Sequence, residues 1–429
     1  MHKKRYEQIN ETLYYERLDN GLKVYLLPKE GFHKTYGLFS TNYGSIDNHF
    51  GFKGQELHQV PDGIAHFLEH KMFEKEEGDV FQKFGQLGAA ANAFTSFTRT
   101  SYLFAATNHI KENLDTLLDF VQDPYFTPET VEKEKGIIGQ EIQMYDDDVY
   151  CQQFYGMLRN LYANHPMGID ILGTEESIAQ ITADDLYLCY QTFYHPSNMT
   201  LFVVGNIDVE ETFAWIKANQ EAKTFAPIQE IVRVFPEQTY EEVVSYSQLK
   251  MPVNRSKSVL GIKGLPQNLP QDPKERMIFR SALHLLLQML LGNTSENFLR
   301  LYNEGIIDDT FGFEFNLDRE FHCALFSSDT DKLDAFEQEV KRIVLNYRTD
   351  PSVNEENLAL LKKKTLGKYF QSLNSLEHIA NQFTQDLFGE LTLFDMPDII
   401  KGITLEDVYQ AADQFICEAG FSRFDLIPE

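Results

Sequence analysis

Cysteine is scarce in this sequence, and basic residues are outnumbered by acidic ones. With 38 basic and 65 acidic side chains among 429 residues, the formal net charge is −27. A surface of that sign repels phosphate, which argues against nucleic-acid binding through a basic face. The thiols are scattered and never form a Cys-x-x-Cys pair, so neither a disulfide framework nor a thiolate metal site is expected. The cysteines are Cys151, Cys189, Cys323 and Cys417.

Long apolar runs are missing as well. No stretch approaches the roughly 18 consecutive apolar residues of a membrane-spanning helix. Residues 1–21 include basic side chains but lack the apolar segment of a secretory signal peptide. We therefore expect a cytoplasmic protein with reduced thiols. Its acidity keeps molecules apart by like charge, or it marks an acidic cavity that attracts basic peptides or cations.

The residues that are present predict a folded protein of two or three domains. Apolar residues make up 43% of the chain and aromatic residues 13%, which is enough for substantial cores. The length allows two or three domains of roughly 150 residues. Residue type and apolar spacing predict strands within 22–42, 101–106 and 201–205, and helices at 63–73, 111–121 and from Thr127 onward.

The order of elements starts again after a polar connector at about 220–240. Residues 181–187 (ITADDLY) resemble residues 403–409 (ITLEDVY), and the charged helix near 129–142 has a counterpart near 353–368. Chance similarity between amphipathic helices is the alternative explanation. The nearly constant offset favours two similar α+β halves.

The strongest chemical signal is the segment His66-Phe67-Leu68-Glu69-His70. Residues four apart share one face of a helix, so His66 and His70 can point at the same metal ion. Glu69 lies near that face and can accept a proton from a water that the metal acidifies. The spacing is the inverse of the His-Glu-x-x-His zinc motif. A solvated or hydrogen-bonded histidine pair is the alternative.

A third ligand has to come from elsewhere, because a catalytic zinc site has three protein ligands and one open position. The segment 132–141 carries Glu134 and Glu141, which are two helical turns apart and share a face. Either glutamate can bind the metal while the other supports a ligand or the water. A solvated charged face is the common alternative.

These motifs resemble the pitrilysin/insulinase family of zinc peptidases. In that family His-x-x-Glu-His is followed by a helix of the pattern Glu-x-Glu-x-x-x-Ile-x-x-Glu, which occurs here at 132–141. The resemblance covers most of residues 20–210, and the second half matches in layout more than in motif. The other matching segments are Asn20–Val24, Tyr43–Ser45, Asn92–Tyr102, His165–Thr174 and Tyr194–Met199.

The resemblance implies a role for each candidate site residue. His66, His70 and Glu141 would bind one zinc ion per chain, and Glu69 would be the general base. Glu134 would support a ligand, and it remains the reserve third ligand because the interval from His70 to Glu141 is short for the family.

The resemblance also implies a fold and a way to hold peptides. Asn92, Ala93 and Phe94 would lie on an edge strand that pairs with the backbone of an extended peptide, although core packing is the alternative for Phe94. The expected fold is α+β, with two homologous α/β-sandwich halves that form a clamshell, each a mixed, largely antiparallel sheet covered by helices. The expected domains are an N-terminal peptidase domain with the zinc site (1–220), a linker (221–244) and a C-terminal repeat domain that binds no metal (245–429).

The second half departs from the active pattern at two places. His284 lies 218 residues after His66, but Leu287 and Gln288 stand where Glu69 and His70 would recur. We therefore expect a metal-free copy of the site, with a lone core histidine as the alternative.

The second departure concerns an Arg and a Tyr that the family usually carries in its second half to stabilise the reaction. Tyr302 and Asp309 stand near those positions, and Arg300 is two residues early. A homologous partner subunit or a homodimer would supply the pair, or this chain anchors its substrate differently.

Three functions follow from these features. The first is a zinc endopeptidase that cleaves peptides or unfolded segments with water activated by zinc and Glu69. The second is a zinc-binding subunit of a heteromeric processing peptidase that does not itself catalyse the reaction. The third is a hydrolase of a small amide. The intact Glu69 favours catalysis, because a structural zinc site has no need of a carboxylate beside an open position.

Overall fold

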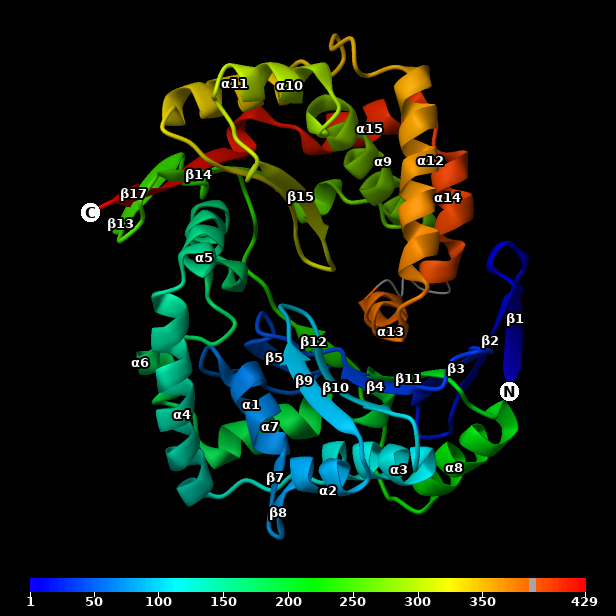
Figure 1. Cartoon of the computed structure of the whole chain (residues 1–429). Helices are drawn as coiled ribbons and strands as arrows, with labels where there is room; N and C mark the ends of the chain where they lie inside the picture. Colours follow the sequence, from blue (N-terminus) through cyan, green and yellow to red (C-terminus); the bar gives the residue numbers. More distant parts are fainter. Residues whose placement is uncertain (386–390) are drawn as a thin grey trace. The chain divides into compact units, whose positions relative to one another are not determined.

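A computed structural model describes residues 1–385 and 391–429, which divide into two compact units. Unit 1 contains Met1–Gln143, Asp170–Phe235 and the segment that starts at Ser372 and includes helix α13 (Leu376–Gln385). Unit 2 contains Met144–Ile169, Pro236–Gln371 and the C-terminal segment that ends at Glu429. Neither unit is a continuous stretch of sequence. Figure 1 labels the elements of both units.

Unit 1 is built on a mixed seven-stranded sheet with the order β1-β2-β3-β11-β4-β10-β9. Strand β11 runs parallel to β3, and the other neighbouring pairs are antiparallel. The central strands β4 and β11 are buried along almost their whole length, as expected of a sheet that is covered on both faces. The strands are β1 (His2–Tyr6), β2 (Glu11–Arg17), β3 (Lys23–Pro28), β11 (Met199–Gly205), β4 (Thr35–Thr41), β10 (Thr100–Ala106) and β9 (Ala90–Thr95).

The helices of unit 1 bury apolar stripes against one continuous core. In α3 the predicted stripe of Leu114, Leu117, Leu118 and Val121 is fully buried. The helices are α1 (Ile64–Met72), α2 (Val80–Gln86), α3 (Ile110–Val121), α4 (Pro128–Asp146, whose last three residues belong to unit 2), α6 (Glu175–Ile178), α7 (Ala183–Phe193) and α8 (Val209–Glu221). Smaller sheets combine β5 (His49–Phe52), β6 (Leu57–Gln59) and β12 (Ile231–Arg233), and β7 (Glu74–Lys75) with β8 (Gly78–Asp79).

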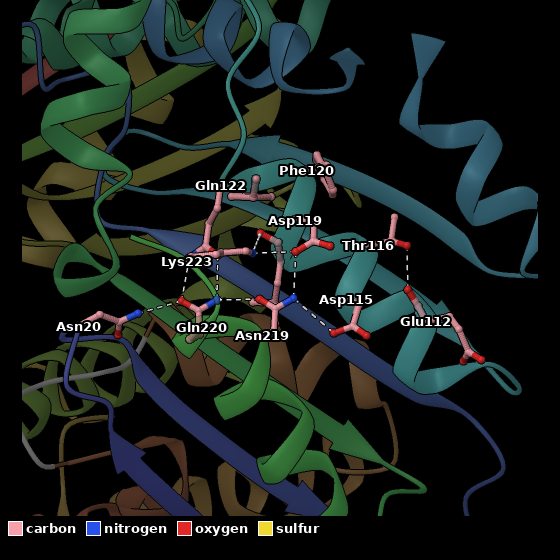
Figure 2. A network of polar contacts seen from close by, with 12 residues as sticks. Asn20, Glu112, Asp115, Thr116, Asp119, Phe120, Gln122, Asn219, Gln220 and Lys223 are labelled. Atoms are coloured by element: carbon pink, nitrogen blue, oxygen red, sulfur yellow. Dashed lines mark hydrogen bonds and ion pairs between the residues drawn. The ribbon is translucent and has the colours of Figure 1, made fainter. Parts of the chain in front are cut away.

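A polar network joins α3 to α8 on the helical side of unit 1 (Figure 2). Asn219 donates to Asp115 and Asp119, at 3.3 and 2.9 Å, and Lys223 pairs with Asp119 at 2.8 Å. Gln220 accepts a hydrogen bond from Asn20 in the turn before β3. The contacts hold the two helices together and tie α8 to the turn that leads into β3.

Unit 2 repeats the sheet of unit 1 without its first two strands. Its order is β13-β17-β14-β16-β15. Strands β13 and β17 run parallel, as β3 and β11 do in unit 1, and the other neighbouring pairs are antiparallel. This order and these directions match β3-β11-β4-β10-β9, which confirms two similar units. The strands are β13 (Tyr246–Met251), β17 (Phe421–Pro428), β14 (Lys257–Gly264), β16 (His322–Asp329) and β15 (Gly312–Leu317). The helices are α5 (Val149–Leu161), α9 (Pro273–Leu291), α10 (Glu296–Asn303), α11 (Leu333–Leu345), α12 (Glu355–Ser372), α14 (Met396–Gly402) and α15 (Leu405–Phe415).

Two helices belong to a unit other than the one their position in the sequence predicts. Helix α5 precedes the end of unit 1 in the sequence, yet it packs on β14 and β17 of unit 2. Its Gly156 lies under the Phe424 ring, where a Cβ atom would come within 2.2 Å. Helix α13 instead packs on β4 and β11 of unit 1, with Phe383 stacked on Phe202 at 4.3 Å. By contacts, α5 therefore belongs with the part of the chain that follows the connector at 221–244, and α13 belongs with the part that precedes it.

The expected elements match the structure closely. The helix at 63–73 is α1, the helix at 111–121 is α3, and the capped start at Thr127 begins α4. The connector is more ordered than its sequence indicates, because β12 pairs with β5 and belongs to unit 1. The α+β fold with mixed sheets and covering helices is confirmed. The clamshell arrangement, and the assignment of peptidase and repeat roles to separate domains, remain predictions.

Candidate metal centre

Helix α1 presents the His-x-x-Glu-His motif from a fixed starting point. It begins after Gly63, whose φ is 86° and whose Cβ position lies 2.3 Å from the Leu172 carbonyl oxygen. Only glycine fits there, since L-residues rarely adopt that φ and a side chain would strike the backbone. His66 and Glu69 are buried, and His70 is partly exposed.

The structure brings His66, His70 and Glu141 together. Their possible donor atoms all lie within 4.8 Å of one another. Glu141 Oε2 lies 3.8 Å from His66 Nε2 and 3.6 Å from His70 Nε2. The two imidazole rings are 4.5 Å apart at an angle of 61°, so they do not stack but converge on the carboxylate.

Glu134 lies behind one of these ligands. Its Oε1 is 3.0 Å from His70 Nδ1, which leaves His70 Nε2 directed toward Glu141. A carboxylate in this position fixes the tautomer and the orientation of a metal-binding imidazole. The sequence left open which glutamate binds the metal. The geometry favours Glu141 as the ligand and Glu134 as the residue that orients His70.

Glu69 is held by a residue that sequence reasoning did not single out. Thr95, at the end of β9, donates a hydrogen bond of 2.6 Å from Oγ1 to Glu69 Oε2. Thr95 lies inside the Asn92–Tyr102 segment that resembles the family. Its hydrogen bond to Glu69 could not be predicted from sequence, because the two residues are 26 positions apart and meet only in the folded chain. Burial raises the pKa of Glu69 to about 7, although the Thr95 hydrogen bond and the charge of His70 oppose the effect.

The two histidines have opposite pKa shifts. Burial, and then the neighbouring His70, lower the pKa of His66 to about 3, so its imidazole stays neutral and can bind a cation. Burial also acts to lower the pKa of His70, but the Glu134 hydrogen bond and the surrounding carboxylates outweigh it, and the pKa is raised. The acidic surroundings therefore favour a positive charge at this place.

The donor set fits zinc. Two imidazole nitrogens and one carboxylate oxygen are a ligand combination of catalytic zinc sites. Ligands about 2.1 Å from a tetrahedral ion lie about 3.4 Å apart, and the separations of 3.6 and 3.8 Å are close to that value. His66 differs from His70, because its buried Nδ1 has no hydrogen-bond partner within the described ranges.

The predicted substrate strand lies beside this centre. Strand β9 carries Asn92, Ala93 and Phe94, and it ends the seven-stranded sheet, with only β10 paired to it among the strands described. Asn92 is exposed, whereas Phe94 is partly buried and lies 5.1 Å from the Arg99 guanidinium.

A cavity of about 700 Å³ connects the strand to the motif, since both contribute to its lining. Glu69, His70 and Glu134 line it together with Asn92 and Ala93. Sequence reasoning missed its apolar lining, Phe73, Phe81 and Ile137, because no motif marks these positions. A second cavity of about 670 Å³ in unit 1 includes none of the predicted site residues.

Unit 2 lacks the metal-binding residues at the equivalent place. On α9, His284 is followed by buried Leu287 and partly exposed Gln288. The alternative of a core histidine is wrong, because His284 is exposed.

Arg300 on α10 forms ion pairs within unit 2. It pairs with Glu304 at 3.1 Å and with Glu339 on α11 at 2.5 Å, while Tyr302 is exposed. The guanidinium is therefore already neutralised by carboxylates of unit 2.

No helix within the described residues is long and apolar enough to cross a membrane.

Comparisons with known proteins agree with the two-unit architecture. Residues 58–175 match the family model for insulinase (peptidase family M16), and residues 180–365 match the model for the peptidase M16 inactive domain. The chain is similar to an uncharacterized zinc protease of Bacillus subtilis, YmfH, at 46% identity over 99% of this chain and 98% of that protein.

Solved structures agree with this similarity. A putative M16-like peptidase from Alicyclobacillus acidocaldarius is 36% identical, with a TM-score of 0.92 over 98% of this chain and 99% of that one. A protease from Helicobacter pylori is 18% identical, with a TM-score of 0.80 over 97% of this chain and 99% of that one, and shares the fold. The chain belongs to the M16 (insulinase) family.

Proposed function

We propose that the chain is a zinc-dependent endopeptidase that cleaves peptides or unfolded segments. The observation that supports this most is the convergence of His66, His70 and Glu141 within 4.8 Å, with Glu69 on the same helix. A purely structural metal site would not require Glu69 or the adjacent strand edge. The name of the Bacillus relative, a zinc protease, supports the same chemistry.

Each side chain has a task in this mechanism. His66, His70 and Glu141 would hold the ion, and Glu134 would keep His70 oriented. When bound, zinc polarises the scissile carbonyl and lowers the pKa of water. Glu69 accepts the proton of the attacking water and passes it to the leaving amine. Thr95 anchors Oε2 of Glu69, so that Oε1 is left for this transfer.

The substrate strand gives selectivity for extended chains. The free edge of β9 can pair with the main chain of a peptide, which holds it regardless of most side chains. Phe73, Phe81 and Ile137 line the adjoining cavity and favour an apolar side chain there. The scattered cysteines support a cytoplasmic location for this reaction.

The test measures zinc content and cleavage together. The purified chain and Glu69→Gln are compared for zinc by elemental analysis and for cleavage of a quenched library of unstructured peptides, with and without chelator. One zinc per chain in both, with chelator-sensitive cleavage only in the native chain, is the expected result. A native chain without zinc would contradict the site assignment. Cleavage of small amides but not of peptides would favour the small-amide hydrolase.

A second candidate is a zinc-binding subunit that depends on a homologous partner. The observation in its favour is the departure at Tyr302 and Asp309, together with the engagement of Arg300 by two acidic residues. Zinc binding without cleavage by the isolated chain, followed by cleavage when a related subunit is added, would support this candidate. Full activity of a monomer would reject it.

A further inference from the structure

A second cavity of unit 1 lies at the C-terminal end of α3. Its volume of about 670 Å³ is within the range of small-molecule pockets. Thr116, Asp119 and Phe120 of α3 line it together with residues of α7 and of the segment that follows α8. Figure 2 shows the part of this wall around Phe120 and Lys223. Every lining residue belongs to unit 1, so the cavity is complete within that unit.

Lys75 on β7 contributes a buried ammonium group to this cavity. The residue is 7% exposed, and its Nζ donates hydrogen bonds to the backbone oxygens of Phe120, at 2.8 Å, and of Asp123. An ammonium group has three donors, so one donor of Lys75 has no partner within the described ranges. No carboxylate forms an ion pair with Lys75 there either. A ligand in the cavity can therefore accept the remaining hydrogen bond.

The charge of Lys75 is incompletely compensated. Burial lowers its pKa to about 8, and the charge of Lys83 acts in the same direction. Asp123 and Glu77 oppose this shift but do not cancel it. The ammonium group therefore lacks a counter-charge that a bound carboxylate would supply.

Charges of both signs line the same cavity without partners of their own. Lys83, Glu77 and Asp123 are exposed, and none of the three side chains forms an ion pair among the residues that the structure describes. Lys223 differs, because it pairs with Asp119 at 2.8 Å. Together with the buried ammonium group, the unneutralised charges are two positive and two negative. A ligand that carries both signs complements them better than a simple anion does.

Aromatic rings form the apolar part of the wall. Phe120 and Tyr194 are 5% and 2% exposed, and Tyr190 stacks on Tyr194 at 5.0 Å. The Tyr190 hydroxyl donates to the backbone oxygen of Val121 at 3.1 Å. Because contacts within unit 1 hold these rings, they present a fixed surface against which an aromatic ligand can be buried.

We propose that this cavity binds a free α-amino acid with an aromatic side chain. The carboxylate of the ligand accepts charge-assisted hydrogen bonds from Lys75 and Lys83. Its ammonium group pairs with Asp123 and Glu77, and its ring packs against Tyr190. The inference goes beyond the proposed peptidase function and does not depend on it.

Ligand-observed NMR with the full chain tests the proposal. The probes are L-phenylalanine, L-phenylalaninamide, which lacks the carboxylate, and 3-phenylpropanoate, which lacks the ammonium group. L-Phenylalanine is expected to bind about tenfold more tightly than either analogue, because each analogue leaves charges of one sign unneutralised. Equal or tighter binding of either analogue would overturn the proposal, and so would a lack of binding by L-phenylalanine.

Two exposed variants place the ligand in this cavity. Lys83→Gln should weaken the binding of L-phenylalanine about threefold without affecting L-phenylalaninamide. Asp123→Asn should weaken it to a similar extent without affecting 3-phenylpropanoate. Lys34→Gln and Asp184→Asn are the matched controls, because these side chains are also exposed in unit 1 but do not line the cavity. Unchanged binding in both test variants would show that the ligand lies elsewhere, and that result or an equal loss in the controls would overturn the proposal.

Lys75→Met should have the largest effect, a loss of about tenfold in the affinity for L-phenylalanine. Lys75 also holds the end of α3, so circular dichroism and thermal unfolding check that this variant is folded. The two exposed variants decide the question if Lys75→Met does not fold. None of these measurements involves cleavage, so their failure would leave the peptidase proposal intact.

Discussion

Units 1 and 2 share a sheet order and differ in chemistry. Both contain the strand sequence in which one parallel pair is followed by antiparallel neighbours. Unit 1 places His66, His70 and Glu141 around one point, whereas α9 of unit 2 has His284, Leu287 and Gln288 where the repeat would place His66, Glu69 and His70. The comparison teaches that the framework tolerates the loss of the metal-binding residues, because a sheet of the same order and a separate apolar core hold the helices of each unit.

The largest expected effect is the loss of activity when Glu69 of unit 1 is replaced. Glu69→Gln should lower kcat about 10³-fold, within the range that general-base catalysis contributes, because the amide cannot accept the proton. Zinc content should stay the same, since Glu69 is not expected to be a ligand. Steady-state kinetics and elemental analysis provide the measurement.

Gln288→Ala in unit 2, next to the repeat position of Glu69, is the control and should leave kcat unchanged. If both variants lost activity equally, the assignment of chemistry to unit 1 would be wrong. If Glu69→Gln lost its zinc, Glu69 would have to be counted among the ligands.

The second effect concerns the support of His70. Glu134→Gln should weaken zinc binding about 10–100-fold, because Nδ1 of His70 loses the charged partner that orients its ring. Competition with a chromophoric chelator measures the affinity. Leu361 lies seven residues after the Asn354 cap of α12, as Glu134 does after the Thr127 cap of α4, and Leu361→Gln should leave zinc affinity unchanged. An unchanged affinity of Glu134→Gln would instead argue that Glu134 does not act on the metal.

The third effect is a loss of stability at low pH that a buried histidine of unit 2 contributes. Burial, and then the charge of Arg276, lower the pKa of His322 to about 3, below its ordinary value of 6.5. Protons therefore bind better to the unfolded chain, so stability is fully present above pH 6.5 and is lost as the pH falls below that value. At pH 5 the free energy of unfolding should be lower by about 2 kcal/mol.

Hydrogen exchange localises this contribution, because the β16 amides around His322 should lose protection as the pH falls from 6.5 to 5. His322→Leu should remove this part of the pH dependence. Neither ring nitrogen of His322 has a partner within the described ranges, so the substitution breaks no hydrogen bond seen there. An unchanged pH profile in His322→Leu would show that other groups dominate.

The smallest effect should be equal in the two units. Thr182 and Thr404 cap α7 and α15, and each forms a capping box with the aspartate three residues later. Thr182→Ala and Thr404→Ala should each cost about 1 kcal/mol, measured as local stability by hydrogen exchange. A large difference between the two variants would contradict the equivalence of these helices.

Much of the site could be predicted from sequence because its geometry is local. The spacing of His66 and His70 depends only on helical periodicity, and so does the pairing of Glu134 with Glu141 on one face. The choice between those two glutamates is not local, because it depends on how α4 packs against α1. The same holds for the Thr95–Glu69 hydrogen bond, which joins a strand end to a helix.

The fold class could be predicted from the sequence, but the assignment of every helix to one of the two units could not. Residue patterns predicted the strands and helices, and the match between 181–187 and 403–409 revealed the repetition. The exchange of α5 and α13 between units was not predictable, because an amphipathic helix shows that it has an apolar face but not which sheet covers that face.

The sequence by itself determined the elements, the repeated order and the metal-binding motif, since these depend on neighbours within a few turns. Tertiary structure alone decided which glutamate approaches the histidines and which sheet each exchanged helix covers. These outcomes depend on contacts between residues far apart in the chain. The burial of apolar surface and the electrostatic interactions that stabilise such contacts arise only when the cores form.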